Sequence, residues 1–162
     1  MEKIYLRKAE LSDCENLLNA FKRSAKYLQP WTYTPVNIER YISQQDVYML
    51  CYEKEIAGVF SLSGIVRGAF HSAYLGYNAF VPYQGKGYMS AGMNLLLKEA
   101  FDNVKLHRLE ANIQPENFPS KKLVEKLGFQ KEGFSQKYLN IGGEWKDHER
   151  WAILNDHWQE DV

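Results

Sequence analysis

The chain has 162 residues, with 20 Lys or Arg balanced by 20 Asp or Glu, and 45% of its residues are apolar. A chain of this length can bury about 70% of the surface that it exposes when unfolded, so it needs no metal or disulfide in order to fold. Its zero formal net charge argues against a nucleic-acid-binding protein and against a polybasic membrane binder. The two cysteines, Cys14 and Cys51, form no C-x-x-C motif, and we expect no metal site.

The N-terminal residues predict a cytoplasmic location. Residues 1–7 form a charged segment, where a signal peptide would carry a basic stretch followed by an apolar run. The uncharged stretch at residues 56–66 falls well short of the ~20 apolar residues that a membrane helix needs. We therefore expect no membrane partner.

The first half of the chain predicts one strand, two helices and three further strands. Ser12 and Glu15 have the spacing of a capping box, which predicts a helix that begins at Ser12. Apolar residues recur at helical spacing through residues 17–28. The expected strands cover residues 3–7, 47–53, 56–66 and 72–81, and a second helix covers residues 37–44.

The second half alternates helical and strand-like patterns. A long helix with an apolar side at residues 93–101 is followed by a strand at 108–113, a loop at 115–119 and a short helix at 120–127. Strands at 129–139 and 145–154 flank the hairpin turn Gly142-Gly143. The order β-α-α-β-β-β-α-β-α-β-β indicates an α/β fold with a mixed, mostly antiparallel sheet and helices on both faces.

A glycine-rich loop joins the expected strand at residues 72–81 to the long helix. Glycines such as Gly85 and Gly87 let backbone N–H groups turn toward an anion, and the helix N-terminus adds partial positive charge. The loop is no Walker loop, because Lys86 is followed by Gly87, and no dinucleotide fingerprint, because Ser90 stands at the third glycine. On these residues alone, a diphosphate site and a plain strand-to-helix turn are equal alternatives.

The loop also has a family resemblance. Gln84-x-x-Gly87-x-Met89 resembles the Gln/Arg-x-x-Gly-x-Gly/Ala signature of the GNAT superfamily of acetyl-CoA-dependent N-acetyltransferases, with Met89 in place of the last small residue. The blocks at residues 108–120, 123–129 and 132–134 resemble the second half of that family's core. Those at residues 28–31 and 138–148 resemble the branch that acetylates the N-terminal residues of ribosomal proteins.

The resemblance implies a GNAT fold in which two central strands splay apart to admit the pantetheine arm of acetyl-CoA. The backbone groups of Phe80 and Val81 would pair with that arm, and Asn117 would bind it by a hydrogen bond. The residues that the resemblance assigns to the diphosphate are Gln84, Gly85, Lys86, Gly87, Tyr88 and Met89. A helix-capping role is the alternative for Asn117.

Two residues are candidates for the chemistry. Where many family members carry a general-acid tyrosine, this chain has Val124, and the nearby hydroxyl is that of Ser120. Ser120 is either a helix cap or the group that assists the leaving thiolate, and it lies near the cofactor in either case. Glu110, in a strand interior, is the candidate base, with an ion pair to a neighbouring Arg or Lys as the alternative. The four histidines fit no catalytic triad or metal spacing, and we expect them on the surface or in hairpins.

The acceptor is expected to be a primary amine, with a protein N-terminus favoured. The aromatic residues Trp31, Tyr33 and Trp145 would line its cleft, unless they are core or dimer contacts in a homo-oligomer. A small amine as acceptor and a CoA-binding regulatory module without turnover are the two rival hypotheses. The whole chain, residues 1–162, is expected to form one N-acetyltransferase domain.

Overall fold

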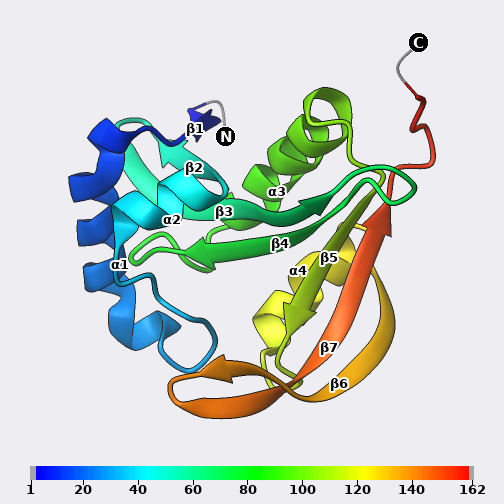
Figure 1. Ribbon diagram of the computed structural model, residues 1–162. Helices are drawn as coiled ribbons and strands as arrows, with labels where there is room; N and C mark the ends of the chain where they lie inside the picture. The colour runs from blue at the N-terminus through cyan, green and yellow to red at the C-terminus, as the bar shows by residue number, and fades with distance from the viewer. Residues whose placement is uncertain (1–2, 161–162) are drawn as a thin grey trace.

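The structure, a computed structural model, describes residues 3–160 and contains one open sheet of seven strands (Figure 1). The strands are β1 (Ile4–Lys8), β2 (Asp46–Tyr52), β3 (Glu55–Val66), β4 (Ser72–Ala79), β5 (Arg108–Ile113), β6 (Gln130–Ile141) and β7 (Glu144–Leu154). The helices are α1 (Cys14–Leu28), α2 (Ile38–Gln44), α3 (Tyr88–Lys98) and α4 (Phe118–Lys126), with short helical turns at Leu11–Asp13 and Glu99–Asn103. The sheet order is β1-β2-β3-β4-β5-β7-β6, and only the β4–β5 pair is parallel.

The sheet separates two hydrophobic cores, because successive side chains of a strand point to opposite faces. Leu17, Phe21 and Leu28 of α1 pack with Met49 and Val59 on one face. On the other face α3 and α4 pack on a cluster that includes Leu50, Phe60, Leu75, Leu109 and Ala111. Figure 1 shows this arrangement, with α1 and α2 at the left, α3 above β3 and α4 behind β5. The predicted α/β fold, mostly antiparallel with helices on both faces, is confirmed.

The sheet opens between β4 and β5. The two strands pair only from Ser72 to Tyr74, although β4 continues to Ala79 and β5 to Ile113. The N–H of Phe80 donates to the carbonyl of Ala57 on β3 at 3.0 Å. Because backbone groups of a strand alternate between its two edges, those of Tyr77 and Ala79 face away from β3 and into the opening. The far half of β4 is therefore an unpaired edge inside the sheet.

Helix starts are where the structure differs most from the sequence-based expectation. The first helical segment begins at Leu11, and the predicted cap Ser12 lies inside its first turn. Instead of Ser12, the carboxylate of Asp13 accepts a hydrogen bond from the N–H of Glu10 at 2.7 Å, and Arg7 holds that carboxylate. The fourth helix begins two residues earlier than predicted, since Asn117 caps it. At both helix starts the side chain that makes the capping hydrogen bond differs from the serine that the spacing predicted.

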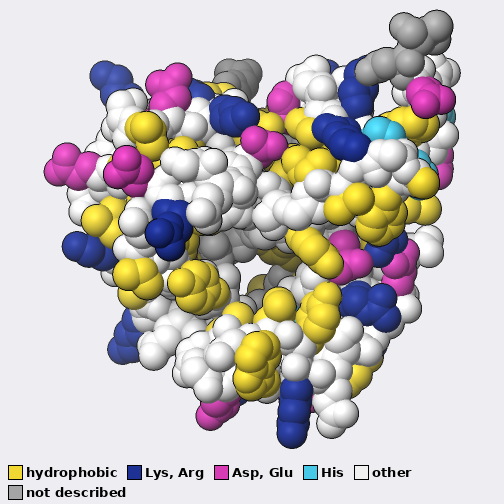
Figure 2. Space-filling view, in the orientation of Figure 1, with side chains coloured by type: hydrophobic (Ala, Val, Ile, Leu, Met, Phe, Trp, Pro, Cys, Tyr) yellow, Lys and Arg dark blue, Asp and Glu magenta, His cyan; other side chains and the backbone are white. Residues whose placement is uncertain are grey.

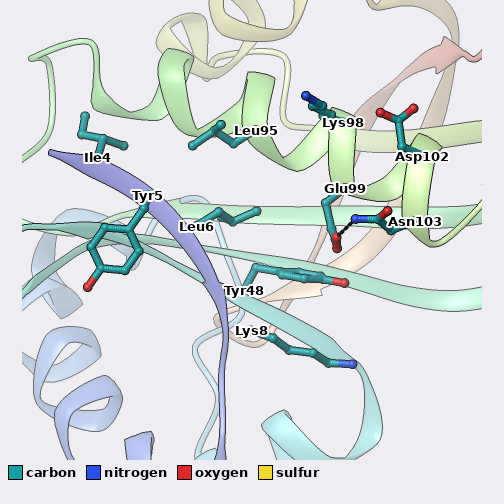
Figure 3. Close-up of a pocket in the computed structure, with 10 residues that line it drawn as sticks. All are labelled: Ile4, Tyr5, Leu6, Lys8, Tyr48, Leu95, Lys98, Glu99, Asp102 and Asn103. Carbon is teal, nitrogen blue, oxygen red and sulfur yellow. Dashed lines mark hydrogen bonds between the residues drawn. The ribbon is translucent and has the colours of Figure 1, made fainter. Parts of the chain in front are cut away.

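A groove of about 700 Å³ lies between β1 and α3, at the edge of the sheet far from the opening (Figure 3). Tyr48 lies at its floor, and charged side chains such as Lys98 and Glu99 line its rim. No residue of the glycine-rich loop, of β5 or of α4 lines it. Within residues 3–160, no helix is both long and apolar enough to cross a bilayer.

Candidate active site

The glycine-rich loop forms an anion cradle at the start of α3. Gly85 and Gly87 have φ of 71° and 82°, which glycine adopts without strain. Gly87 is the N-cap of α3 and has no side chain to cap the helix. The first intrahelical bond runs from the N–H of Ala91 to the carbonyl of Gly87. The N–H groups of Tyr88, Met89 and Ser90 therefore have no helical partner and are free for a bound anion.

The residue that departs from the family signature is accommodated by a glycine on the neighbouring strand. A Cβ on Gly58 of β3 would lie 2.7 Å from the sulfur of Met89. Gly58 thus leaves the space that the long Met89 side chain occupies. The backbone N–H of Met89 belongs to the first turn of α3.

Phe80 and Val81, which the sequence assigned to the pantetheine arm, already use their backbone groups. The N–H of Val81 donates to the hydroxyl of Ser24 at 3.0 Å, and its carbonyl accepts from Arg23 at 2.7 Å. The carbonyl of Phe80 accepts from the N–H of Tyr83, and its side chain is fully buried. Two helical residues of α1 therefore hold the end of β4. The groups that remain available to an extended ligand in the opening are those of Tyr77 and Ala79.

One face of the opening carries hydroxyl groups. Ser120 lies in the first turn of α4, and its Oγ is 2.6 Å from the Oη of Tyr77 on β4. Asn117 caps α4 through its Oδ1, which accepts from the N–H of Ser120 at 3.4 Å. The capping role that we considered for Ser120 therefore belongs to Asn117. Val124, on the same helix, is fully buried in the hydrophobic core.

The opposite face carries the candidate base. Glu110 and Asn112 alternate along β5 with the core residues Leu109 and Ala111, so their side chains leave the sheet on the face away from α4. The Glu110 carboxylate lies 2.9 Å from Arg108 Nη2 and 3.2 Å from Asn112 Nδ2. Glu110 thus forms the ion pair with a neighbouring Arg that we considered as its alternative role. Each carboxylate oxygen has a second lone pair, so it can still accept a hydrogen bond from water.

The aromatic residues expected to line the acceptor cleft lie in the loop after α1 and at the start of β7. Trp31 belongs to the loop after α1, and buried Gln114, just beyond β5, donates to the carbonyl of Pro30 at 2.9 Å. This bond ties the loop to the end of the strand that carries Glu110. Tyr33 and Trp145 are exposed by 66% and 61%, so neither is a core residue. Figure 2 shows the surface hollowed below its middle, above the β6–β7 hairpin.

Three residues of this region were missed by the sequence reasoning. Tyr77, Ser24 and Gln114 act through contacts with residues 43 to 84 positions away, which no local pattern contains. His148 lies in the β6–β7 hairpin, one of the two places expected for the histidines, and is 2% exposed there. Its Nδ1 donates to the carbonyl of Lys146. Burial lowers the pKa of His148 from its usual value. No group of three His, Cys, Asp or Glu side chains suited to a metal ion is found between residues 3 and 160.

The comparisons with known proteins identify the family. The family model described as an acetyltransferase (GNAT) domain matches residues 3–130, which is more than half of the chain. The chain belongs to the GNAT acetyltransferase family. The matched residues include the glycine-rich loop and strands β1 to β5, between which the sheet opens. Strands β6 and β7 lie almost entirely beyond the match.

Two of the most similar GNAT relatives carry names that refer to ribosomal protein S5. The [ribosomal protein uS5]-alanine N-acetyltransferase of Escherichia coli is 42% identical over 106 residues, which are 65% of this chain and 55% of that protein. The chain thus aligns with little more than half the length of this curated relative. The crystal structure of ribosomal-protein-S5-alanine acetyltransferase from Vibrio fischeri superimposes with a TM-score of 0.89 at 30% identity, over 99% of this chain and 97% of that one.

A third GNAT relative was solved with a ligand. Mycobacterium smegmatis RimJ, in complex with CoA-disulfide, has a TM-score of 0.85 and 26% identity, and the match covers 97% of this chain and 84% of that one. The GNAT fold of this chain is therefore shared with a protein that binds a CoA derivative.

Proposed function

We propose that this chain is an acetyl-CoA-dependent N-acetyltransferase that modifies the α-amine of a protein N-terminus, of the ribosomal-protein type. One observation carries the proposal above all: the sheet opens beside a glycine-rich anion cradle, with hydroxyls on one face and a carboxylate on the other. We further propose that residues 1–162 act as one acetyltransferase domain, since all seven strands belong to one sheet.

Acetyl-CoA fits the loop and the opening as the acetyl donor. Its diphosphate would lie against the N–H groups at the start of α3, where the helix dipole favours negative charge. Its pantetheine arm would enter beside β4 and pair with the free backbone groups of Tyr77 and Ala79. Asn117 adds a donor, because no bond from its Nδ2 is found within residues 3–160. This arrangement would bring the thioester close to Ser120.

The amine would approach from the face that carries Glu110. An α-amine has a reference pKa near ~8, against about 10.4 for lysine, so about a tenth of it is neutral at pH 7. A carboxylate that acts through one water molecule is therefore sufficient for an α-amine. Trp31, Tyr33 and Trp145 would hold the residues that follow the amine. Exposed aromatic rings suit a peptide better than a small amine, because a peptide offers more surface to cover.

The transfer needs no covalent intermediate with the protein. The neutral amine nitrogen attacks the carbonyl carbon of the thioester, a new N–C bond forms, and the C–S bond breaks with its electron pair going to sulfur. Glu110, through water, receives the proton that the nitrogen loses. Ser120 donates a hydrogen bond to the departing thiolate, which later takes a proton from water. Thiolate is a good leaving group, so most of the acceleration comes from holding the reactants together.

Release of free thiol from acetyl-CoA, measured against a panel of amines, tests the proposal. The panel contains a peptide with a free N-terminal alanine, the same peptide with a blocked N-terminus and an internal lysine, and spermidine. We expect the free N-terminal peptide to be the best acceptor. Thiol release with spermidine alone would support the small-amine alternative, and CoA binding without turnover would support a regulatory module.

A further inference from the structure

The two hydroxyls of Tyr77 and Ser120 bridge the opening of the sheet. They lie 43 positions apart in sequence and 2.6 Å apart in space. Tyr77 stands on the part of β4 that has lost β5 as a partner, and Ser120 stands on the helix that follows β5. The hydrogen bond therefore connects two elements at the point where the backbone no longer does.

The direction of this hydrogen bond follows from acidity. A phenol is a much stronger acid than an aliphatic alcohol, so Tyr77 is the better donor of the two. Burial raises the pKa of Tyr77, so its hydroxyl keeps its proton. If Tyr77 donates, Ser120 accepts through one lone pair and its own hydrogen stays free. The backbone N–H of Ser120 is occupied by Asn117, so α4 fixes the position of the side chain as well.

We infer that Tyr77 is a positioning residue that holds the Ser120 hydroxyl with its hydrogen aimed into the opening, toward the leaving sulfur. This inference rests on the proposed function. Tyr77 keeps its proton throughout the step: when the N–C bond forms and the C–S bond breaks, the sulfur receives the electron pair and a hydrogen bond from Ser120. A proton relay from Tyr77 would leave a buried phenolate, which burial disfavours.

The test is a double-mutant cycle of Tyr77→Phe and Ser120→Ala, with kcat and the KM for acetyl-CoA as readouts. Tyr77→Phe removes one oxygen and keeps the ring, and we expect kcat to fall about 3–10-fold, the effect of one hydrogen bond, with KM within about twofold. Ser120→Ala should lower kcat by roughly 10–100-fold. The double variant should equal Ser120→Ala, because Tyr77 acts only through Ser120.

The control is Tyr48→Phe, which also removes a buried phenol from the same face of the sheet. Tyr48 lies on β2 (Figure 3). It pairs with Phe60 on β3, which pairs with Tyr77 on β4, so the control lies two strands away. Its kcat should match the wild type. Ser120→Thr keeps a hydroxyl and should retain kcat within about fivefold only while Tyr77 is present.

Three results would overturn the inference. One is a Tyr77→Phe variant with wild-type kcat. A second is a cycle in which the effects of the two substitutions multiply, since the two residues would then act independently. A third is a change in KM and the melting temperature alone, since the hydroxyl pair would then only join β4 to α4. Failure of the proposed function looks different: the wild type would then release no thiol with any N-terminal peptide.

Discussion

Glu110 carries its charge between two fixed partners, Arg108 and Asn112. Arg108 also binds Glu132 through two hydrogen bonds of 2.8 and 2.7 Å, so its guanidinium is held even without Glu110. The geometry gives a carboxylate of fixed direction on the face where the amine is proposed to arrive. A carboxylate of this kind can act as a base through water without moving.

Replacing Glu110 with Gln keeps the shape and removes the base. We expect kcat to fall about 10–100-fold near neutral pH and to recover in part above about pH 8, where the amine is already neutral. The pH dependence of kcat measures this. Glu132→Gln is the matched control, because it removes the other partner of Arg108, and its profile should follow the wild type. A Glu110→Gln profile that follows it too would make Glu110 a structural residue.

Gly87 provides the second residue-scale prediction. Gly87→Val places a branched side chain where the diphosphate is proposed to lie, and we expect CoA affinity to fall at least about tenfold, or 1.4 kcal/mol. Gly68→Val is the control for backbone strain, because Gly68 also has a positive φ, of 70°, and a Cβ there would meet nothing within 4 Å. Titration calorimetry measures the CoA affinity of both variants. Equal affinities in the two variants would show that the glycine-rich loop does not bind CoA.

At the scale of elements, the strands could be predicted closely and the opening between them could not. Alternating apolar residues and the Gly142-Gly143 turn are local signals, and they predicted β6 and β7 to within a few residues. The separation of β4 from β5 depends on where each strand finds its partner. Only the family resemblance anticipated it. Glu110 could be named from the sequence because a charged residue in a strand interior is a local signal. Tyr77 could not, because its role depends on a contact with Ser120, 43 positions away.

The helix α3 must approach the sheet closely, and Gly92 permits this. A Cβ on Gly92 would lie 2.7 and 2.8 Å from the two terminal carbons of Leu50 and 3.1 Å from Phe60, all of which are buried. Overpacking of this kind costs about 1–3 kcal/mol, more than the ~1 kcal/mol that Ala gains over Gly inside a helix.

Gly92→Ala should therefore lower the melting temperature by about 2–6 °C. Asn94→Ala, at an exposed position of the same helix, should leave it unchanged or raise it slightly. Thermal unfolding of both variants provides the comparison. If Gly92→Ala were as stable as Asn94→Ala, the close contact between α3 and the sheet would not be a constraint.

For the molecule as a whole, His148 links stability to pH. Burial lowers the pKa of His148, so the folded protein keeps it neutral while the unfolded chain takes up a proton below about pH 6.5. The free energy of unfolding should thus fall as the pH drops from about 7 toward 5. Asp13, Glu132 and Glu149 have lowered pKa values, so their stabilising contributions are lost only at more acid pH.

Denaturant unfolding of the wild type and of His148→Asn at several pH values measures this link. Asn keeps a donor near the position of Nδ1 and has no titratable group, so the slope between pH 7 and 5 should flatten. His157→Asn, at an exposed position, should keep the wild-type slope. An unchanged slope in His148→Asn would mean that His148 does not titrate differently in the two states.

Transfer to an α-amine is tested most directly by locating the acetyl group on a peptide that offers both kinds of amine. The peptide has a free N-terminal alanine and an internal lysine, and tandem mass spectrometry after reaction with acetyl-CoA identifies the modified nitrogen. We expect the acetyl group on the N-terminal nitrogen alone, and no product from the same peptide with its N-terminus blocked. Acetylation of the lysine, or a faster reaction with a small polyamine than with the peptide, would contradict this function.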